Sequence, residues 1–418
     1  MVNTRLAIKG QDFYINGKLT YSEIENADRD VQGLLMNARF IQGVFDDKID
    51  RSRFNRFGKI FDPDKNTDDL IAALPEWYNH GLRAFTVGLQ GGWPVFTIMV
   101  DEIDNNPFGK DGKLDKAYAD RLDRVIRAAD SLGIVVIVNI LYWAQANHLY
   151  DGVAIKNSIK NTASFLRENG YTNVIIDVAN EFNIDRWEKH NFIRSPETIQ
   201  LLINLAREES GGLPVGCSGG GGYFNKKVAE VSDVVLIHGN GLTQGKYYDL
   251  IKKTQEIAPD KPILCNEDSP CFTRLDVARL THTTWGHYDN FTKQEPPCDW
   301  GITPGQDTFY ARRMARTVGI KMPDLPLEEQ FYLQGLEENT EWQGKRWIHL
   351  AAEYPERVKF VDFFRNDNFI YRSYDEPFFL FRETTWIQKP WKVTADDREW
   401  AVEIVLNNGE VIRKTVEV

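Results

Sequence analysis

The sequence has few cysteines and no excess of positive charge. Its four cysteines, Cys217, Cys265, Cys271 and Cys298, include no CxxC pair, and such usage suits a reduced compartment better than a disulfide scaffold. Lys and Arg number 50 against 61 Asp and Glu, a net charge of -11, which is the wrong sign for binding the phosphate backbone of nucleic acid. We therefore expect no nucleic-acid partner.

Long hydrophobic segments are also absent. The longest apolar run, Ile134 to Ala144, is interrupted by Asn139 and falls well short of the roughly 20 residues that a membrane-spanning helix needs. Residues 1–17 contain neither the apolar core nor the small-residue cleavage site of a secretory signal. We expect no membrane insertion, and a cytoplasmic location as sequenced, or a periplasmic or secreted one if a signal peptide was removed.

Familiar cofactor motifs are missing as well. No GxGxxG follows the first strand-like run, and the four glycines Gly219–Gly222 lack the Lys-Ser/Thr that completes a phosphate-binding loop. A metal-dependent barrel hydrolase needs His and Asp ligands clustered at strand ends, whereas the chain has only seven His and no His-x-His in the first run. We expect no cofactor and no metal, and keep the metal-dependent hydrolase as an alternative that a chelator would reveal.

What the sequence does contain is a regular alternation of strand-like and helix-like segments, from about residue 33 to about residue 320. Such alternation is typical of βα units on a parallel sheet. Eight units favour an α/β fold of the closed (β/α)8 TIM-barrel type. The eight strand-like runs are Leu34–Phe40, Leu82–Leu89, Ile134–Tyr142, Asn173–Asn180, Pro214–Cys217, Val234–His238, Pro262–Asn266 and Thr283–Gly286.

Capping residues mark several helices between these runs. Asp115 precedes a segment with apolar residues at helical spacing that stops at Gly133, and Ser195 begins another. Thr67 is expected to open a helix that ends near Gly81.

Two flanking segments fall outside the barrel, which we place at residues 33–340. Residues 1–32 contain the turn signal Asn16-Gly17 between short apolar stretches, which predicts a β-hairpin that covers the lower end of the barrel. Residues 341–418 are expected to form an all-β, sandwich-like domain, with strands at Val358–Arg365, Phe369–Ser373, Trp400–Leu406 and Val411–Val418.

This tail carries a first resemblance. The segment Val361–Asn366, followed by Tyr371, Glu376 and Trp386, resembles bacterial immunoglobulin-like domains. The resemblance covers roughly the last 70 residues and implies an accessory domain that acts as a spacer or helps to bind a partner.

Two carboxylates end predicted barrel strands. The fourth run closes with Asn180-Glu181, and the seventh is followed directly by Glu267. The carboxyl ends of all barrel strands meet at one mouth, where active sites of this fold lie. Two carboxyls about 5 to 5.5 Å apart are what a retaining glycosidase needs, one to protonate the leaving oxygen and one to attack the anomeric carbon.

Asn-Glu after the fourth strand and Glu after the seventh, in an eight-stranded barrel, resemble the clan A glycoside hydrolases, especially the cellulase-like family 5. The resemblance implies that Glu181 is the general acid/base, held protonated by burial, and that Glu267 is the nucleophile. Asn180 would bind the sugar 2-hydroxyl, and His238 would contact the nucleophile region. Phe182 stands where many members have Pro, and Arg39 is expected to replace the family arginine that is missing late in the second strand.

Further residues near strand ends are candidates for binding substrate. Trp285 matches the family tryptophan that forms the floor of the sugar site, and other loop aromatics are suited to stacking on sugars. Asp177 is expected to be a hydrogen-bonded core acid, although an inverting enzyme would use it as a base. The remaining candidates for sugar contacts are Asn139, Trp143 and Tyr223.

The sequence therefore predicts a retaining glycoside hydrolase that cleaves β-glycosidic bonds of an oligo- or polysaccharide. A non-catalytic carbohydrate-binding protein on a glycosidase-like barrel is a further alternative. The glycone, endo or exo action, the oligomeric state and the role of the β domain stay open.

Overall fold

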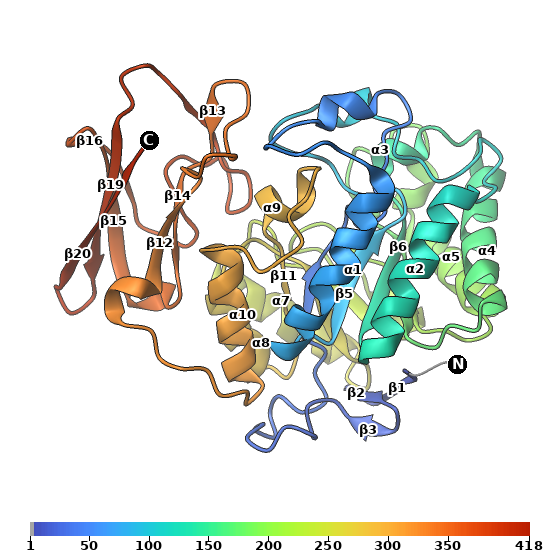
Figure 1. Cartoon of the computed structure of the whole chain (residues 1–418). Helices are drawn as coiled ribbons and strands as arrows, with labels where there is room; N and C mark the ends of the chain where they lie inside the picture. Colours follow the sequence, from blue (N-terminus) through green and yellow to red (C-terminus); the bar gives the residue numbers. More distant parts are fainter. Residues whose placement is uncertain (1–3) are drawn as a thin grey trace.

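Eight parallel strands form a barrel at the centre of the larger of two lobes in the computed structural model, which describes residues 4–418 (Figure 1). The strands overlap all eight runs that the sequence predicts, so the (β/α)8 expectation is confirmed. They are β4 (Asn37–Arg39), β5 (Ala84–Gly88), β6 (Val135–Leu141), β7 (Val174–Ala179), β8 (Val215–Gly216), β9 (Val235–His238), β10 (Ile263–Glu267) and β11 (Gly286–His287).

The strands follow one another around the ring in chain order. One ladder has the order β11-β4-β5-β6-β7-β8, and β9 pairs with β10 in a second. Two contacts join the ladders: a parallel bridge between Leu264 and Thr284, and a hydrogen bond of 2.8 Å from the Asp233 amide to the Val215 carbonyl. The sheet therefore closes on itself.

The barrel interior changes from apolar to polar toward its carboxyl end. Side chains on a strand alternate between faces, and on β6 Ile137 belongs to the inner apolar cluster while Asn139 lies two residues further on. Asn139 is paired in register with Asp177 of β7, and both are fully buried. A polar layer therefore lies beneath the catalytic end.

Helices surround the barrel and begin with capping side chains. Asp115 caps α2, which ends at Gly133 with φ 87, and Ser195 caps α5. The helix expected from Thr67 begins earlier, because Pro63 occupies the first turn and Asp62 accepts from the Lys65 amide. The main helices are α1 (Pro63–Asn79), α2 (Lys116–Leu132), α4 (Gly152–Glu168), α5 (Pro196–Glu209), α6 (Lys226–Val231), α7 (Gln244–Ile257), α8 (Thr273–Leu280) and α10 (Gln306–Thr317), with the short α3 (Trp143–Ala146) and α9 (Asn290–Gln294) at the mouth.

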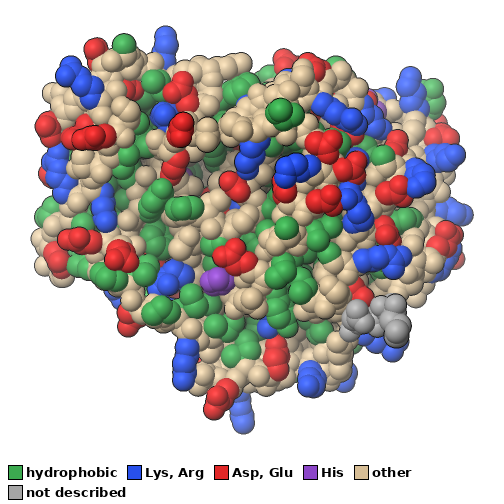
Figure 2. Space-filling model, in the orientation of Figure 1, with side chains coloured by type: hydrophobic (Ala, Val, Ile, Leu, Met, Phe, Trp, Pro, Cys, Tyr) green, Lys and Arg blue, Asp and Glu red, His purple; other side chains and the backbone are tan. Residues whose placement is uncertain are grey.

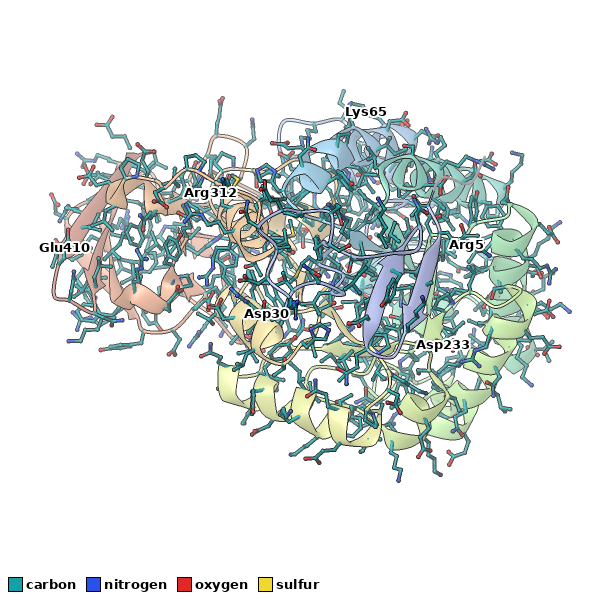
Figure 3. All side chains as sticks on the ribbon, turned by 90° about the horizontal axis from the view of Figure 1, so that it is seen from below. Arg5, Asp30, Lys65, Asp233, Arg312 and Glu410 are labelled. Atoms are coloured by element: carbon teal, nitrogen blue, oxygen red, sulfur yellow. The ribbon has the colours of Figure 1, made fainter. Side chains whose placement is uncertain are left out.

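The N-terminal hairpin lies across the lower end of the barrel, as the view from below shows (Figure 3). It consists of β1 (Leu6–Lys9), β2 (Asp12–Ile15) and the short β3 (Lys18–Leu19). Phe13 is buried in the same cluster as interior residues such as Leu35 and Leu264. The hairpin therefore seals the end opposite the catalytic mouth.

The smaller lobe is an all-β domain with its own core. A four-stranded sheet of order β16-β15-β19-β20 packs on a three-stranded sheet of order β12-β14-β17, with a small β13-β18 pair beside them. The strands are β12 (Phe331–Gln334), β13 (Lys345–Arg346), β14 (His349–Ala352), β15 (Val358–Arg365), β16 (Asn368–Ser373), β17 (Phe378–Phe379), β18 (Trp391–Lys392), β19 (Glu399–Leu406) and β20 (Val411–Glu417).

The boundary of this lobe differs from the one placed at residue 341. β12 pairs antiparallel with β14, and Phe331 and Leu333 belong to the apolar core of the smaller lobe. The domain therefore begins no later than residue 331, because β12 is too short to be recognised from its sequence alone and is defined by its pairing with β14. The immunoglobulin-like resemblance stays a prediction.

A buried ion pair and the hydrogen bonds of Glu376 join the two lobes. Arg312 of α10, labelled at the junction in Figure 3, donates to Glu353 at 2.8 Å, and both side chains are nearly inaccessible. Glu376 reaches from the β domain to accept hydrogen bonds at the start of α8, from the Thr273 amide and hydroxyl.

On the face shown in Figure 2, acidic and basic side chains are interspersed over both lobes. Between residues 4 and 418, no helix combines the length and apolar character needed to span a bilayer.

Candidate active site

Two glutamates face one another at the mouth of the barrel. Glu267 is the last residue of β10, and Glu181 follows β7 by two residues. A carboxylate oxygen of each lies within 4.8 Å of the other and of a ring nitrogen of His238. The side chains of Glu181 and Glu267 are 20% and 12% exposed. This spacing agrees with the roughly 5 to 5.5 Å of retaining glycosidases.

Glu181 occupies an unusual backbone conformation. Its φ is 50, in the left-handed region that residues other than glycine adopt at a cost of about 1–2 kcal/mol. Its amide faces the Ser218 hydroxyl at 3.4 Å, and its carbonyl accepts from the Trp187 indole at 3.0 Å. Neighbouring buried side chains therefore hold the strained turn that aims the carboxylate into the mouth.

His238 at the end of β9 bridges the two carboxylates. Its Nδ1 lies 3.1 Å from Glu181 Oε1 and 3.7 Å from Glu267 Oε2, and the ring is fully buried. Burial opposes a charge on this ring, but Glu267 and Glu181 outweigh it and raise the pKa of His238. The same hydrogen bond and charge outweigh burial at Glu181 and lower its pKa.

These directions correct one expectation. Burial was expected to hold Glu181 protonated, but His238 shifts its pKa the other way. Both shifts favour a proton on His238 over one on Glu181, whose Oε1 lies 3.1 Å from His238 Nδ1.

Arg39 organises the Glu267 side of the site. Its Nη2 lies 2.8 Å from Glu267 Oε2 and donates to Asn180 Oδ1 at 2.7 Å. Its guanidinium lies 5.5 Å from the Tyr288 ring centre. Burial opposes its charge, but Glu267 and its neighbours raise the pKa of Arg39. Asn180 is thereby oriented with its amide nitrogen left to donate to a ligand.

Asn240 completes the hydrogen bonding of Glu267. Its Nδ2 donates to Glu267 Oε1 at 3.0 Å, so each oxygen of Glu267 has one protein partner. Sequence reasoning missed Asn240, and its signal is its position two residues after His238, at the end of a barrel strand. Tyr288 also lies buried, beneath Arg39.

Asp177 supports the site from below. It is fully buried and accepts from the Ser218 amide at 3.1 Å, from the Ser218 hydroxyl at 2.9 Å and from Asn266 Nδ2 at 3.3 Å. Burial raises its pKa. Ser218 also accepts from the Glu181 amide. Through Ser218, Asp177 therefore links the backbone of Glu181 to Asn266, the residue before Glu267. This is the role of a hydrogen-bonded core acid rather than of an inverting base.

Two expected sugar contacts are wrong. Trp285 is 0% exposed, donates to Asp268 at 2.8 Å and packs on Tyr310 at 5.6 Å, because it precedes β11 and points into the core. Asn139 is also 0% exposed, lies in the polar layer below the mouth, and neither of its side-chain atoms has a hydrogen-bond partner. Neither residue can touch a sugar.

The other predicted aromatics lie at the rim. Trp143 is half-buried and packs against Tyr142 at 5.2 Å and Trp93 at 6.5 Å. The Arg186 guanidinium lies 4.9 Å from the rings of both Trp93 and Trp143. Tyr223 is half-buried and packs edge-on against Phe182 at 5.6 Å.

Glu181, His238 and Glu267 are also the one group between residues 4 and 418 whose donor atoms are close enough to hold a metal ion. Arg39 lies 2.8 Å from Glu267 and already supplies a positive charge to this group. A divalent cation would have to be accommodated beside that guanidinium, which disfavours the metal-dependent alternative.

The sequence matches one family model. Residues 61–202 match the cellulase family, glycosyl hydrolase family 5. The matched segment includes Asn180 and Glu181 and ends within α5, before His238 and Glu267. The expectation of a glycoside hydrolase is confirmed. His238 and Glu267 lie outside the matched segment, so their place in the site rests on the geometry alone. No curated protein sequence matches the chain.

Several solved structures are similar in outline. An endo-1,4-β-mannanase from Rhizomucor miehei is 11% identical, with 76% of this chain and 100% of that one covered and a TM-score of 0.48. An endo-β-1,4-mannanase from Thermotoga petrophila is 11% identical over 96% and 99%, with a TM-score of 0.45. A calcium-binding mutant of Bacteroides uniformis β-glucuronidase 2 is 10% identical over 99% of this chain and 47% of that one, with a TM-score of 0.44, so this chain spans about half of that enzyme.

Proposed function

We propose that this retaining glycoside hydrolase cleaves a β-glycosidic bond with Glu267 as nucleophile and Glu181 as general acid and base. The observation that carries the proposal is the close pair of partly exposed carboxylates. Their surroundings differ: Glu267 accepts from Arg39 and Asn240, whereas Glu181 faces the proton of His238. Such unequal environments separate the roles of two carboxyls.

In the first step, a Glu267 oxygen attacks the anomeric carbon and the bond to the leaving oxygen breaks. The proton of His238, whose Nδ1 lies 3.1 Å from Glu181 Oε1, passes to Glu181 and from Glu181 to the leaving oxygen, so that Glu181 is left ionised. Asn180, oriented by Arg39, is placed to donate to a hydroxyl next to the cleaved bond. The product of this step is a glycosyl ester on Glu267.

In the second step, the ionised Glu181 accepts a proton from water and returns it to His238. The resulting hydroxide adds to the anomeric carbon and the bond to Glu267 breaks, which restores the carboxylate that Arg39 and Asn240 hold. Two displacements at one carbon leave its configuration unchanged.

The test is hydrolysis of aryl β-glycosides and β-linked oligosaccharides, with the product anomer followed by NMR. Wild type is expected to release the β-anomer first. Glu267→Gln is expected to lose turnover, and Glu181→Ala to lose about 10²- to 10⁴-fold on oligosaccharides but much less on aryl glycosides whose leaving groups need no proton. Glu188→Ala, an exposed residue in the same loop, is the control. Near-normal turnover by Glu267→Gln would refute the assignment, and sugar binding without turnover would favour the non-catalytic alternative.

A further inference from the structure

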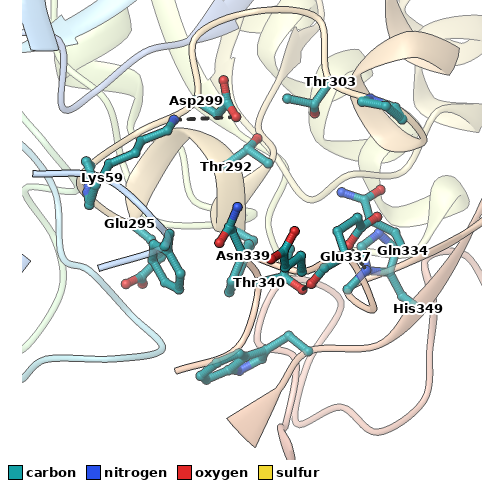
Figure 4. Close-up of a pocket in the computed structure, with 17 residues that line it drawn as sticks. Lys59, Thr292, Glu295, Asp299, Thr303, Gln334, Glu337, Asn339, Thr340 and His349 are labelled. Carbon is teal, nitrogen blue, oxygen red and sulfur yellow. Dashed lines mark hydrogen bonds and ion pairs between the residues drawn. The ribbon is translucent and has the colours of Figure 1, made fainter. Parts of the chain in front are cut away.

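A cavity of 440 Å³ lies between the two lobes and has no part in the mechanism above (Figure 4). Its walls come from three segments far apart in the sequence. They are the turn at Phe57 after the 3-10 helix Arg51–Phe54, the segment from α9 to Pro304, and the stretch from β12 to β14 of the β domain. Its volume lies within the roughly 300–1,000 Å³ of small-molecule sites.

Phe57 occupies the tip of a two-residue turn that disfavours phenylalanine. The Lys59 amide donates to the Arg56 carbonyl at 3.0 Å, and the two residues between them, Phe57 and Gly58, have φ of 54 and 69. Turns with positive φ at both central positions strongly favour Asn-Gly. A bulky residue held in this conformation strains the backbone, and such strain is found mostly at ligand-binding and active sites.

The Phe57 ring belongs to an aromatic wall of the cavity. It lies 5.4 Å from Phe291 of α9, which in turn lies 5.5 Å from Trp347 of the β domain. Phe57 and Phe291 are half-buried. Both lobes therefore contribute rings to one wall, and two of those rings are partly open to a ligand.

Polar groups line the rest of the cavity. Glu337, Asn339 and Thr340 stand close together in Figure 4, opposite Thr292. Trp347 and His349 are 3% and 6% exposed, and Trp347 Nε1 and His349 Nδ1 have no hydrogen-bond partner.

The charges in the lining disfavour an anionic ligand. Glu295 is paired with Arg56 at 3.1 Å, and Asp299 with Lys59 at 3.5 Å. The carboxylates of Glu337 and Glu338 remain, so the lining is acidic on balance. Burial lowers the pKa of His349 to about 4, so this ring adds no positive charge. Anionic ligands are therefore disfavoured.

The cavity lies next to the active site along the chain. Tyr288 lies beneath Arg39, and Phe291 in the cavity wall follows it by three residues. Three residues span at most about 10 Å. The cavity wall at Phe291 therefore lies within about 10 Å of the backbone of a residue that contacts Arg39.

We propose that this cavity between the lobes binds an uncharged saccharide unit, with a pyranose face on Phe57 and Phe291 and its hydroxyls on the carboxylates, amide and hydroxyls opposite. Partly exposed aromatic rings with surrounding hydrogen-bond acceptors suit a ring that has an apolar face and polar edges. The class of ligand rests on the proposed function. The unit is either a distal part of the substrate chain or a separate sugar.

The test uses the full chain with Glu267→Gln, which binds without turnover, titrated calorimetrically with neutral β-1,4-linked glucan and mannan oligosaccharides of two to six units. Adding Phe57→Asn removes the ring and places the favoured residue in the turn, so the fold is expected to be kept, with no fall in Tm. We expect about tenfold weaker binding on loss of the ring. Phe369→Asn, an exposed phenylalanine of β16, is the control and should change nothing.

Chain length distinguishes the two sources. A distal part of the substrate predicts that Phe57→Asn weakens hexasaccharide binding and leaves disaccharide binding unchanged. A separate sugar predicts two disaccharides bound by Glu267→Gln and one after Phe57→Asn is added. Equal binding by both variants at every length would overturn the inference, even if wild type hydrolyses glycosides. Dependence on Phe57 without hydrolysis by wild type would overturn only the proposed function.

Discussion

Ser218 is the residue through which the strained backbone of Glu181 is held. Its hydroxyl donates to Asp177 at 2.9 Å and lies 3.4 Å from the Glu181 amide. Ser218→Ala leaves both groups buried without that partner, at a cost of about 1–3 kcal/mol, and frees the turn to relax. We expect kcat to fall about tenfold or more with little change in KM.

The control for Ser218 is Ser210→Ala. Ser210 is also buried and also joins a backbone amide, that of Leu213 at 3.2 Å, but it lies at the end of α5 far from the mouth. Urea unfolding should show both variants destabilised, and only Ser218→Ala should lose kcat. Equal kcat in the two variants would mean that Glu181 needs no such support.

His238 sets the pH range in which a proton is available to Glu181. Its pKa is raised above the ordinary value of about 6.5 because two carboxylates face it, so its proton is retained as pH rises through 6.5. We expect the alkaline limb of kcat/KM to lie above that value. In His238→Asn the proton must reside on a carboxyl, and the limb should move to lower pH. An unmoved limb would show that another group supplies the proton.

The residues of the site differ in how well the sequence predicts them. Glu181, Glu267 and Arg39 stand at the ends of strands that long apolar runs locate, so their meeting follows from the order of the strands. Trp285 stands beside such a run too, but one position decides whether a side chain enters the mouth or the core, and β11 begins only at Gly286. Aromatic residues near short strands are therefore the least predictable members of the site.

Among the elements, α8 depends on a carboxyl from the other lobe. Glu376 accepts from the Thr273 amide and hydroxyl, and burial raises its pKa to about 7 despite these donors. Its folded pKa lies above its unfolded value of 4.5. Its contribution to stability is therefore fully present below pH 4.5 and is lost as pH rises through 7.

This linkage predicts a pH-dependent difference between wild type and Glu376→Gln. The variant keeps an acceptor for the same donors and does not titrate. The unfolding free energy of wild type relative to the variant should fall by about 3 kcal/mol between pH 4.5 and pH 8. Urea unfolding at the two values measures it, and a constant difference would mean that Glu376 titrates normally.

The strands of the barrel were predictable and several in the β domain were not. The barrel strands are buried on both faces, and most of them lie within predominantly apolar runs of the sequence. β13, β17 and β18 have two residues each, and the four-residue β12 follows a polar stretch between the barrel and the β domain. Pairing with distant strands creates these elements, and a single strand's own sequence carries little of that information.

For the whole molecule, the position of the domain boundary is testable by truncation. A chain that ends at residue 326 loses the complete β domain, whereas one that ends at 340 keeps β12 without its partner β14. An unpaired edge strand promotes association, so we expect the longer fragment to aggregate more. Light scattering of the purified fragments measures this, and the reverse order would place β12 with the barrel.

Both fragments should also be less stable than the full chain. Each lacks Glu353 and leaves Arg312 with no carboxylate at a site that is nearly inaccessible in the whole protein. Removal of the β domain also opens Arg312 to water, so the loss falls short of the roughly 3–5 kcal/mol that a charge left buried without its partner would cost.

The hairpin that seals the lower end of the barrel has a consequence for the timing of folding. Phe13 leaves the ribosome well before Leu264, a member of its cluster, because Leu264 is made some 250 residues later. At about 5–20 residues per second, this contact waits on the order of 10 to 50 s. During translation the nascent hairpin therefore exposes Phe13 until these partners have been made, and the lower end of the barrel is closed only after its seventh strand has been synthesised.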